Sequence, residues 1–429
     1  MSELYSIFKE HPVITTDSRD CPQGSIFFAL KGETFNGNAY AEAALDKGCA
    51  YAVIDEAQYA KDDRYIVVDD VLLTLQQLAR EHRRTLGTPV IGVTGTNGKT
   101  TTKELIAAVL AKKYNVHYTK GNFNNHIGVP KTLLQLTPEH EIAVIEMGAN
   151  HPGEIKTLVD IVEPDCGIIT NVGRAHLEGF GSFEGVIRTK GELYDFLRQK
   201  EGAKVFIDAD NEHLAKIAGG LSLIKYGVES TDDDIVVKGK VMDCKPFLRF
   251  QWMVNGKEYI ASTHLIGAYN IYNMLAAATI GLHFGVTPEL ANEALEGYMP
   301  SNNRSQLTIT ESNKLIVDTY NANPTSMMAA LKNFCLMQVA PKMAILGDMR
   351  ELGEVSHEEH QKVVNFLQDN NITNVWLVGS EFGNTDCEYR KFPDVAAVKD
   401  AIAATKPQDC YILIKGSNGI RLFELPELL

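Results

Sequence analysis

Short apolar runs alternate with stretches of helical periodicity along most of this chain. The runs at residues 89–93, 142–145, 167–170 and 204–207 have the character of buried strands. Between them, apolar residues recur at the spacing of a helix face. Because parallel strands need a crossover connection, usually a helix, this alternation predicts a parallel α/β sheet in the middle of the chain.

Two further blocks flank this one, and we expect three α/β domains, at residues 1–86, 87–306 and 307–429. The first block has strand-like runs at 25–30, 51–54 and 65–68 and a helical pattern at 72–86, before Gly87-Thr88-Pro89 interrupts the chain. In the central block, the runs at 234–237 and 247–252 predict appended antiparallel strands.

The third block has predicted strands at 315–318, 343–347, 375–379 and 411–415 and a predicted helix at 357–367. These elements predict a second doubly wound unit. No Gly-x-Gly-x-x-Gly follows its first strand, which argues against a dinucleotide site.

Composition narrows the class of protein. The 429 residues carry a net charge of −14, with 45% hydrophobic and 22% charged residues. Nucleic acids and anionic membranes need a basic surface, so we expect no nucleic-acid partner, although one anionic substrate can still bind in a locally basic cleft.

The cysteines and the apolar runs bear on the compartment. The seven cysteines are dispersed, with no Cys-x-x-Cys pair, which is typical of a reducing compartment. Residues 1–5 show no signal-peptide pattern, and no apolar run approaches the length of a membrane span. We therefore expect a cytoplasmic protein without membrane insertion. Independently of these features, we expect a monomer.

The most informative segment is Thr94 to Glu104, which follows a predicted strand and leads into a predicted helix. Glycines let backbone N–H groups approach phosphates, and a helix N-terminus adds partial positive charge. Lys99 is placed to reach the β- and γ-phosphates of a nucleoside triphosphate, and Thr100 to bind Mg²⁺. The predicted phosphate-binding residues are Gly95, Thr96, Asn97, Gly98, Lys99, Thr100 and Thr101. Val93 stands where the generic pattern has glycine.

Ligands of such sheets bind beyond the carboxyl ends of the strands. Glu146 follows the run at 142–145, and His176 lies shortly after the run at 167–170. By themselves they read as a surface acid and a loop histidine, but at the edge that holds a nucleotide loop they become candidate metal ligands.

Two helical segments carry further candidates. Lys190 lies on a helix predicted to begin near Ser182, where a lysine is ordinarily a solvated charge. Asn270 and Asn273 share one face of a later helix, and either a base-reading or a helix-capping role fits them.

Taken together, eleven motifs in order along essentially the whole chain resemble those of the Mur ligases, the ATP-dependent enzymes that build the peptidoglycan stem peptide. The motifs are TDSR (16–19), FFALKGETFNGNAY (27–40), TGTNGKTTTKE (94–104), GNFNNHIGVPKTLL (121–134), EMGANHPGEI (146–155), TNVGRAHLEGFGS (170–182), TKGEL (189–193), GAYNIYNMLAA (267–277), VDTYNANPTSM (317–327), LGDMRELG (346–353) and KGSNGIRL (415–422).

The resemblance implies a UDP-sugar-binding N-terminal domain, a central P-loop ATP-binding domain and a C-terminal Rossmann-like ligase domain, with ATP and Mg²⁺ as cofactors. The implied catalytic residues are Lys99, Glu146, His176 and Lys190, and the implied metal ligands are Thr100, Glu146, His176 and a carbamylated Lys190. The implied adenine and ribose contacts are Asn273, Arg304 and Asp318. The implied UDP-sugar contacts are Ser18, Arg19, Asn122, Asn124 and Asn125, and those near an incoming dipeptide are Tyr320, Asn321, Asn323 and Ser326.

Within the family, the resemblance is closest to the member that joins D-alanyl-D-alanine to UDP-N-acetylmuramoyl-tripeptide. YNANPTS (320–326) favours it, and the Asp-Asn-Pro-Arg motif of ligases that add diaminopimelate is absent. The alternatives are a ligase that adds the third residue, a folylpolyglutamate synthase-like ligase, and a catalytically inactive nucleotide-binding partner. Asn36-Gly37-Asn38 departs from the acid and histidine that the family often has, and Asn302-Asn303-Arg304-Ser305 departs from the usual Gly-Arg context.

Overall fold

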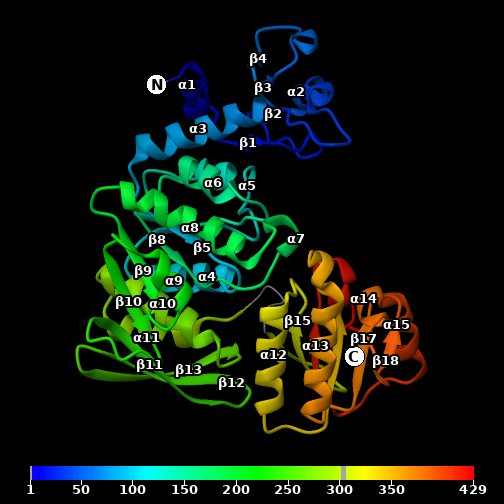
Figure 1. The fold of residues 1–429 in the computed structure, drawn as a ribbon. Helices are drawn as coiled ribbons and strands as arrows, with labels where there is room; N and C mark the ends of the chain where they lie inside the picture. Colours follow the sequence, from blue (N-terminus) through cyan, green and yellow to red (C-terminus); the bar gives the residue numbers. More distant parts are fainter. Residues whose placement is uncertain (1, 301–305) are drawn as a thin grey trace.

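Three sheets organise the chain in the computed structural model, which describes residues 2–300 and 306–429. The N-terminal unit lies at one end, the central unit follows, and the C-terminal unit packs beside the central one (Figure 1). The predicted fold class, three α/β units, is confirmed. Among the described helices, none has the length and apolar character needed to cross a bilayer.

The N-terminal unit is a four-stranded parallel sheet in the order β1-β2-β3-β4. Its elements are α1 (Glu3–Glu10), β1 (Ile14–Thr15), β2 (Ile26–Phe28), η1 (Gly37–Tyr40), α2 (Ala41–Lys47), β3 (Tyr51–Ile54), η2 (Ala57–Tyr59), β4 (Tyr65–Val67) and α3 (Val71–Leu86). Helix α3 begins where the Asp70 carboxylate accepts the Leu73 amide at 2.8 Å, and it ends at Gly87 with φ of 67°.

The central unit has nine strands in the order β13-β12-β11-β10-β9-β8-β5-β7-β6. Its strands are β5 (Val90–Thr94), β6 (Val116–Tyr118), β7 (Ile142–Glu146), β8 (Cys166–Ile169), β9 (Lys204–Asp208), β10 (Leu223–Gly227), β11 (Ile235–Cys244), β12 (Phe247–Val254) and β13 (Lys257–Ile266). Its helices are α4 (Lys99–Leu110), α5 (Gly128–Leu133), α6 (Glu154–Val162), α7 (Leu177–Phe180), α8 (Phe183–Gln199), α9 (Glu212–Ile217), α10 (Asn270–His283) and α11 (Pro288–Gly297). Strands β11, β12 and β13 form antiparallel pairs, and the runs at 234–237 and 247–252 predicted the first two of these strands.

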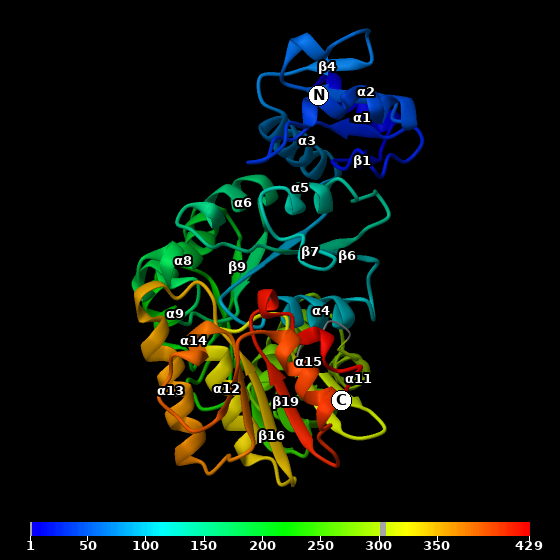
Figure 2. The same cartoon turned by 90° about the vertical axis from the view of Figure 1, so that its right-hand side faces the viewer.

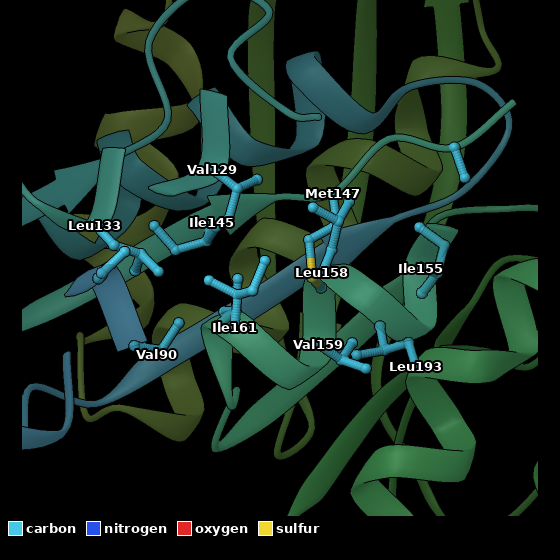
Figure 3. Close-up of a cluster of buried hydrophobic side chains, with 14 of the residues drawn as sticks. Val90, Val129, Leu133, Ile145, Met147, Ile155, Leu158, Val159, Ile161 and Leu193 are labelled. Atoms are coloured by element: carbon cyan, nitrogen blue, oxygen red, sulfur yellow. The ribbon is translucent and has the colours of Figure 1, made fainter. Parts of the chain in front are cut away.

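Apolar side chains fix the helices on both faces of this sheet. On one face Val90 and Ile145 from the strands pack with Leu158 and Val159 of α6 and Leu193 of α8 (Figure 3). On the other face a second buried cluster joins α4, α10 and α11 to the sheet. Burial of each large aliphatic side chain stabilises the fold by about 1.5–3 kcal/mol, so the carboxyl ends of β5, β7, β8 and β9 are held rigidly at one edge.

The C-terminal unit has the strand order β14-β15-β19-β16-β17-β18, parallel except for β14. Its neighbouring strands β19 and β16 are seen side by side in Figure 2. Its elements are β14 (Gln306–Ile309), β15 (Lys314–Asp318), α12 (Pro324–Leu336), β16 (Lys342–Gly347), η3 (Gly353–Val355), α13 (Ser356–Asp369), β17 (Val375–Val378), α14 (Ser380–Gly383), β18 (Arg390–Phe392), α15 (Val395–Ala404), β19 (Tyr411–Lys415), η4 (Asn418–Ile420) and η5 (Leu422–Glu424). The carboxyl end of β15 continues into the segment 319–326, which faces the central unit across the site described next.

Candidate active site

A cavity of about 920 Å³ is lined by residues of all three units. The N-terminal unit contributes Leu72 and Gln76 of α3, and the central unit contributes the loops after β5, β7 and β8 together with α10. The C-terminal unit contributes Asp318, Lys415 and residues between Tyr320 and Ala329. This volume lies at the upper end of the range that is typical of ligand pockets, about 300–1,000 Å³.

The loop between β5 and α4 forms one wall, and its glycines are required by close contacts. Gly98 has a φ of 76°, and a Cβ at this position would lie 2.7 Å from Asn273 Oδ1. Gly95 has a φ of 140°, and a Cβ there would lie 2.1 Å from Thr170 Oγ1. Lys99 Nζ donates to the carbonyl oxygens of Gly95 and Thr96 at 2.9 and 3.0 Å. The ammonium group therefore lies beside the loop backbone at the start of α4, where an anion is favoured.

Glu146 lies at the centre of a buried hydrogen-bond network. It is 1% exposed, and the Thr100 hydroxyl donates to its Oε2 at 2.9 Å while Asn124 Nδ2 donates to its Oε1 at 2.8 Å. Lys103 Nζ lies 3.5 Å from Oε2. The structure thus brings together Thr100 and Glu146, two residues predicted as metal ligands.

The oxygen donors fit Mg²⁺, which usually binds proteins through one or two carboxylates while phosphates and water complete its shell. No group of three or more His, Cys, Asp or Glu residues within 2–300 and 306–429 could hold a metal alone. A magnesium ion at Thr100 and Glu146 would take its remaining oxygen ligands from water or phosphate.

His176 also lines the cavity, but its ring faces the C-terminal unit. Its Nδ1 pairs with the carboxylate of Glu351, and its own backbone is left-handed with φ of 50°. Burial lowers the pKa of His176, while the Glu351 charge acts in the opposite direction. In this arrangement His176 links two units.

Lys190 is buried, contrary to the ordinary expectation for a lysine on a helix. Lys190 lies on α8 and is only 2% exposed, and its Nζ donates to the Ala149 carbonyl at 3.2 Å. Burial, followed by the positive charge of Lys99, lowers the pKa of Lys190 well below its usual value. The predicted start of this helix is confirmed, because the Ser182 hydroxyl accepts the Gly185 amide at 3.0 Å.

Helix α10 contributes an amide pair to the cavity wall. Asn273 Nδ2 donates to Asn270 Oδ1 at 2.8 Å, and the Thr102 hydroxyl donates to Asn273 Oδ1 at 3.0 Å. The N-cap of α10 is Tyr269, which makes no side-chain cap bond, so the two asparagines are wall residues rather than caps.

The C-terminal residues divide into two groups. Asp318 lines the cavity and accepts from Lys415 Nζ at 2.6 Å, and Tyr320, Asn321 and Ser326 line it too. Asn323 instead caps α12 in a capping box with Ser326. Arg304, predicted to contact ribose, lies outside the described residues.

Asn323 also reaches the phosphate loop, because its Nδ2 donates to Asn97 Oδ1 at 2.8 Å. This bond runs directly between the central and C-terminal units.

The predicted UDP-sugar contacts are not all in one place. Asn122, Asn124 and Asn125 line the cavity, and Asn125 Oδ1 also accepts the Gly128 amide at the start of α5. Ser18 and Arg19 do not line it, and the Arg19 side chain is 87% exposed and bonded to Asp17. These two residues lie on the N-terminal unit, apart from the enclosed part of the site.

Sequence reasoning missed several cavity residues, including Gln76, Asp208, Tyr272 and Lys415. Asp208 ends β9 and Lys415 ends β19, so the strand-end rule that found Glu146 would have found both. Gln76 carries no local signal, since it belongs to an amphipathic helix.

Comparison with known families gives three matches. Residues 12–83 match the Mur ligase family, catalytic domain; residues 93–281 match the Mur ligase middle domain; and residues 303–418 match the Mur ligase, glutamate ligase domain. The UDP-N-acetylmuramoyl-tripeptide--D-alanyl-D-alanine ligase of Bacillus subtilis (strain 168) is 36% identical over 425 residues, which cover 96% of this chain and 92% of that protein.

Two solved structures are similar over nearly their whole length. MurF from Acinetobacter baumannii superposes with a TM-score of 0.86 at 31% identity, covering 96% of this chain and 93% of that one. The MurF ligase from Thermotoga maritima in complex with ADP gives a TM-score of 0.87 at 26% identity, covering 100% of this chain and 98% of that one. The chain belongs to the Mur ligase family.

Proposed function

We propose that this chain uses ATP to join D-alanyl-D-alanine to UDP-N-acetylmuramoyl-tripeptide, releasing ADP and phosphate, as the last cytoplasmic step in making the peptidoglycan precursor peptide. The observation that carries the proposal is the placement of the phosphate loop opposite residues 320–326 within one cavity. Relatives that match over more than nine-tenths of this chain bear the name of that ligase.

Forming an amide from a carboxylate at neutral pH needs a better leaving group than oxide. The tripeptide carboxylate attacks the γ-phosphorus of ATP, giving an acyl phosphate and ADP, and the dipeptide amine then displaces phosphate. Lys99 and the N-terminus of α4 hold the transferring phosphoryl group and stabilise its charge. Thr100 and Glu146, together with oxygens of the nucleotide, would hold Mg²⁺, which would screen the negative charge further.

We assign Lys190 to carbamylation by CO₂, a reaction in which the amine releases a proton, and the carbamate would be a ligand of a second Mg²⁺. An unpaired ammonium group is costly to bury, and no described carboxylate forms an ion pair with Lys190. A depressed pKa supplies the neutral amine that CO₂ requires. His176 would join this metal set when its ring leaves Glu351.

The remaining residues bind substrates. Asn273 contacts adenine, and Asp318 and Arg304 contact the ribose. Asn122, Asn124, Asn125, Ser18 and Arg19 contact the UDP-sugar, whose length accounts for the distance of the last two from the cavity. Tyr320, Asn321 and Ser326 receive the dipeptide, and Asn323 positions this segment through α12. The protein acts as a cytoplasmic monomer.

An acyl phosphate is hydrolysed by water, so the units must close around it. Contacts across the cavity support closure: Asn323 bonds to Asn97, the Thr325 hydroxyl accepts the Arg174 amide at 3.1 Å, and His176 pairs with Glu351.

ADP release measured with each acceptor and nucleophile tests the proposal. We expect turnover with the tripeptide precursor and D-alanyl-D-alanine, and little with single D-alanine, glutamate or diaminopimelate, because a polar site penalises ligands that leave its groups unpaired. Efficient coupling of diaminopimelate or lysine to the dipeptide precursor would identify the third-residue ligase instead. Comparing tripeptides that end in diaminopimelate and in lysine would define the acceptor.

A further inference from the structure

A buried carboxyl group without a role in the reaction above lies at the carboxyl end of β9. Asp208 is 7% exposed and lines the cavity. Its Oδ1 accepts the Asp210 amide at 3.0 Å. Among the described residues no other group donates a hydrogen bond to this carboxyl, which leaves Oδ2 for a ligand.

The part of the cavity beside Asp208 suits a base rather than phosphates. Tyr272 of α10 lies near Asp208, Asn273 follows it on the same helix and also lines the cavity, and none of these three side chains is cationic. The phosphate loop approaches the same wall, since a Cβ on Gly98 would lie 2.7 Å from Asn273 Oδ1. A nucleotide whose phosphates lie on the loop can therefore extend its base along α10 toward β9.

The groups packed around Asp208 favour its neutral form. Tyr194 of α8, Tyr226 of β10 and Tyr272 of α10 face it, and Asp210 is the nearby charge. Burial raises the pKa of Asp208 to about 7; the Asp210 amide lowers it and the Asp210 carboxylate raises it. Tyr194 Oη is itself buried without a hydrogen-bond partner.

A neutral carboxyl presents an O–H donor beside a carbonyl acceptor, whereas a carboxylate only accepts. Adenine offers a ring-nitrogen acceptor beside its N6 donor, which the neutral form matches as an asparagine amide does. Because the Asp210 amide already donates to Oδ1, Oδ2 is the atom that carries the proton and donates to the ring nitrogen of adenine. Hypoxanthine has a hydrogen on N1 and donates at that position, so it pairs instead with an acceptor such as an ionised carboxylate. We propose that protonated Asp208 reads the adenine edge of the nucleotide and makes the choice of base depend on pH. This rests on the proposed use of ATP.

The test measures ADP and IDP binding to the full chain by calorimetry at pH 6 and pH 8. Both ligands carry the same diphosphate, so the ratio of their dissociation constants cancels its titration. We expect the preference for ADP over IDP to fall about tenfold from pH 6 to pH 8. The reason is that the protonated fraction of a group with a pKa of about 7 falls by the same factor over this range. Asp208→Asn should prefer ADP equally at both.

Asp195→Asn is the matched control, because it removes the same charge from the exposed side of α8, and it should behave as the wild type does. A wild-type ratio that does not change with pH would overturn the proposal, and this measurement decides even if Asp208→Asn does not fold. A ratio in Asp208→Asn that still falls tenfold would overturn it too. Binding needs no acceptor, so loss of ligation alone would reject the proposed function and leave the role of Asp208 standing.

Discussion

The buried pair of Lys103 and Glu146 provides a direct test of how the site is held together. Their side chains are 0% and 1% exposed, and Nζ lies 3.5 Å from Oε2. Lys103→Met keeps a long apolar chain but leaves the carboxylate without its cation. Removing one partner of a buried pair typically costs about 3–5 kcal/mol.

The lower end of that range applies here, because Thr100 and Asn124 still donate to the carboxylate. For a unit of this size about 1 kcal/mol corresponds to about 2–4 °C, so a loss of about 3 kcal/mol lowers the melting temperature by roughly 6–12 °C. Calorimetry measures this change in melting temperature. Because the three units need not unfold together, the unfolding transition of the central unit is identified as the one that ADP shifts to higher temperature.

Two further variants make the measurement specific. Lys112→Met removes a lysine that pairs with Glu293 at the surface and should shift the transition little. Adding Glu146→Gln to Lys103→Met removes the uncompensated charge and should recover much of the loss. If Lys103→Met melts within about 2 °C of the wild type, Glu146 does not depend on Lys103 for its charge, and the reasoning is refuted.

Three other changes have defined outcomes. Lys99→Ala should lower turnover by about 10²–10³-fold with unchanged melting; near-normal phosphate release would remove Lys99 from the reaction. Lys190→Ala should be inactive and partly rescued by acetate, and an unmodified mass for residue 190 together with indifference to bicarbonate would contradict carbamylation. Burial lowers the pKa of His117 to about 4, and its Nε2 bonds to the Thr132 carbonyl. Between about pH 6.5 and pH 4, His117 is therefore protonated in the unfolded chain but remains neutral in the folded chain. Stability should therefore fall by up to about 3 kcal/mol between about pH 6.5 and pH 4, and the urea midpoints of wild type and His117→Gln should converge over that window; a constant difference would show that His117 does not titrate there.

Elements with strong local signals could be predicted from the sequence. The run at 51–54 is β3, and the helix predicted at 357–367 lies within α13. Strands such as β13 and β14 escaped prediction. Strand β13 has one buried face, and little of the surface of β14 is buried, so neither has a strong hydrophobic pattern. Each forms a strand because it pairs with a neighbour, β13 with β12 and β14 with β15.

Part of the site followed from sequence for the same reason. Glycine spacing locates the phosphate loop, and the end of an apolar run locates Glu146. The absence of glycine at position 93 has a simple structural reason, since Val93 is a buried residue of β5 and the turn begins after it. Lys103 was invisible as a partner of Glu146, because a lysine in the first turns of a helix reads as solvated until the neighbouring strand is placed.

The contacts that join units across the cavity depend on how separate folds are placed, so no single segment could reveal them. At the cavity they are polar: Asn97 with Asn323, Arg174 with Thr325, and His176 with Glu351. Polar contacts can be exchanged for contacts with water at small net cost in free energy. Exposing the apolar side chains that fix α6 on its sheet would cost much more. The residues that hold phosphate and the segment that faces it are thus aligned by bonds that can also be released, as entry of two large substrates requires.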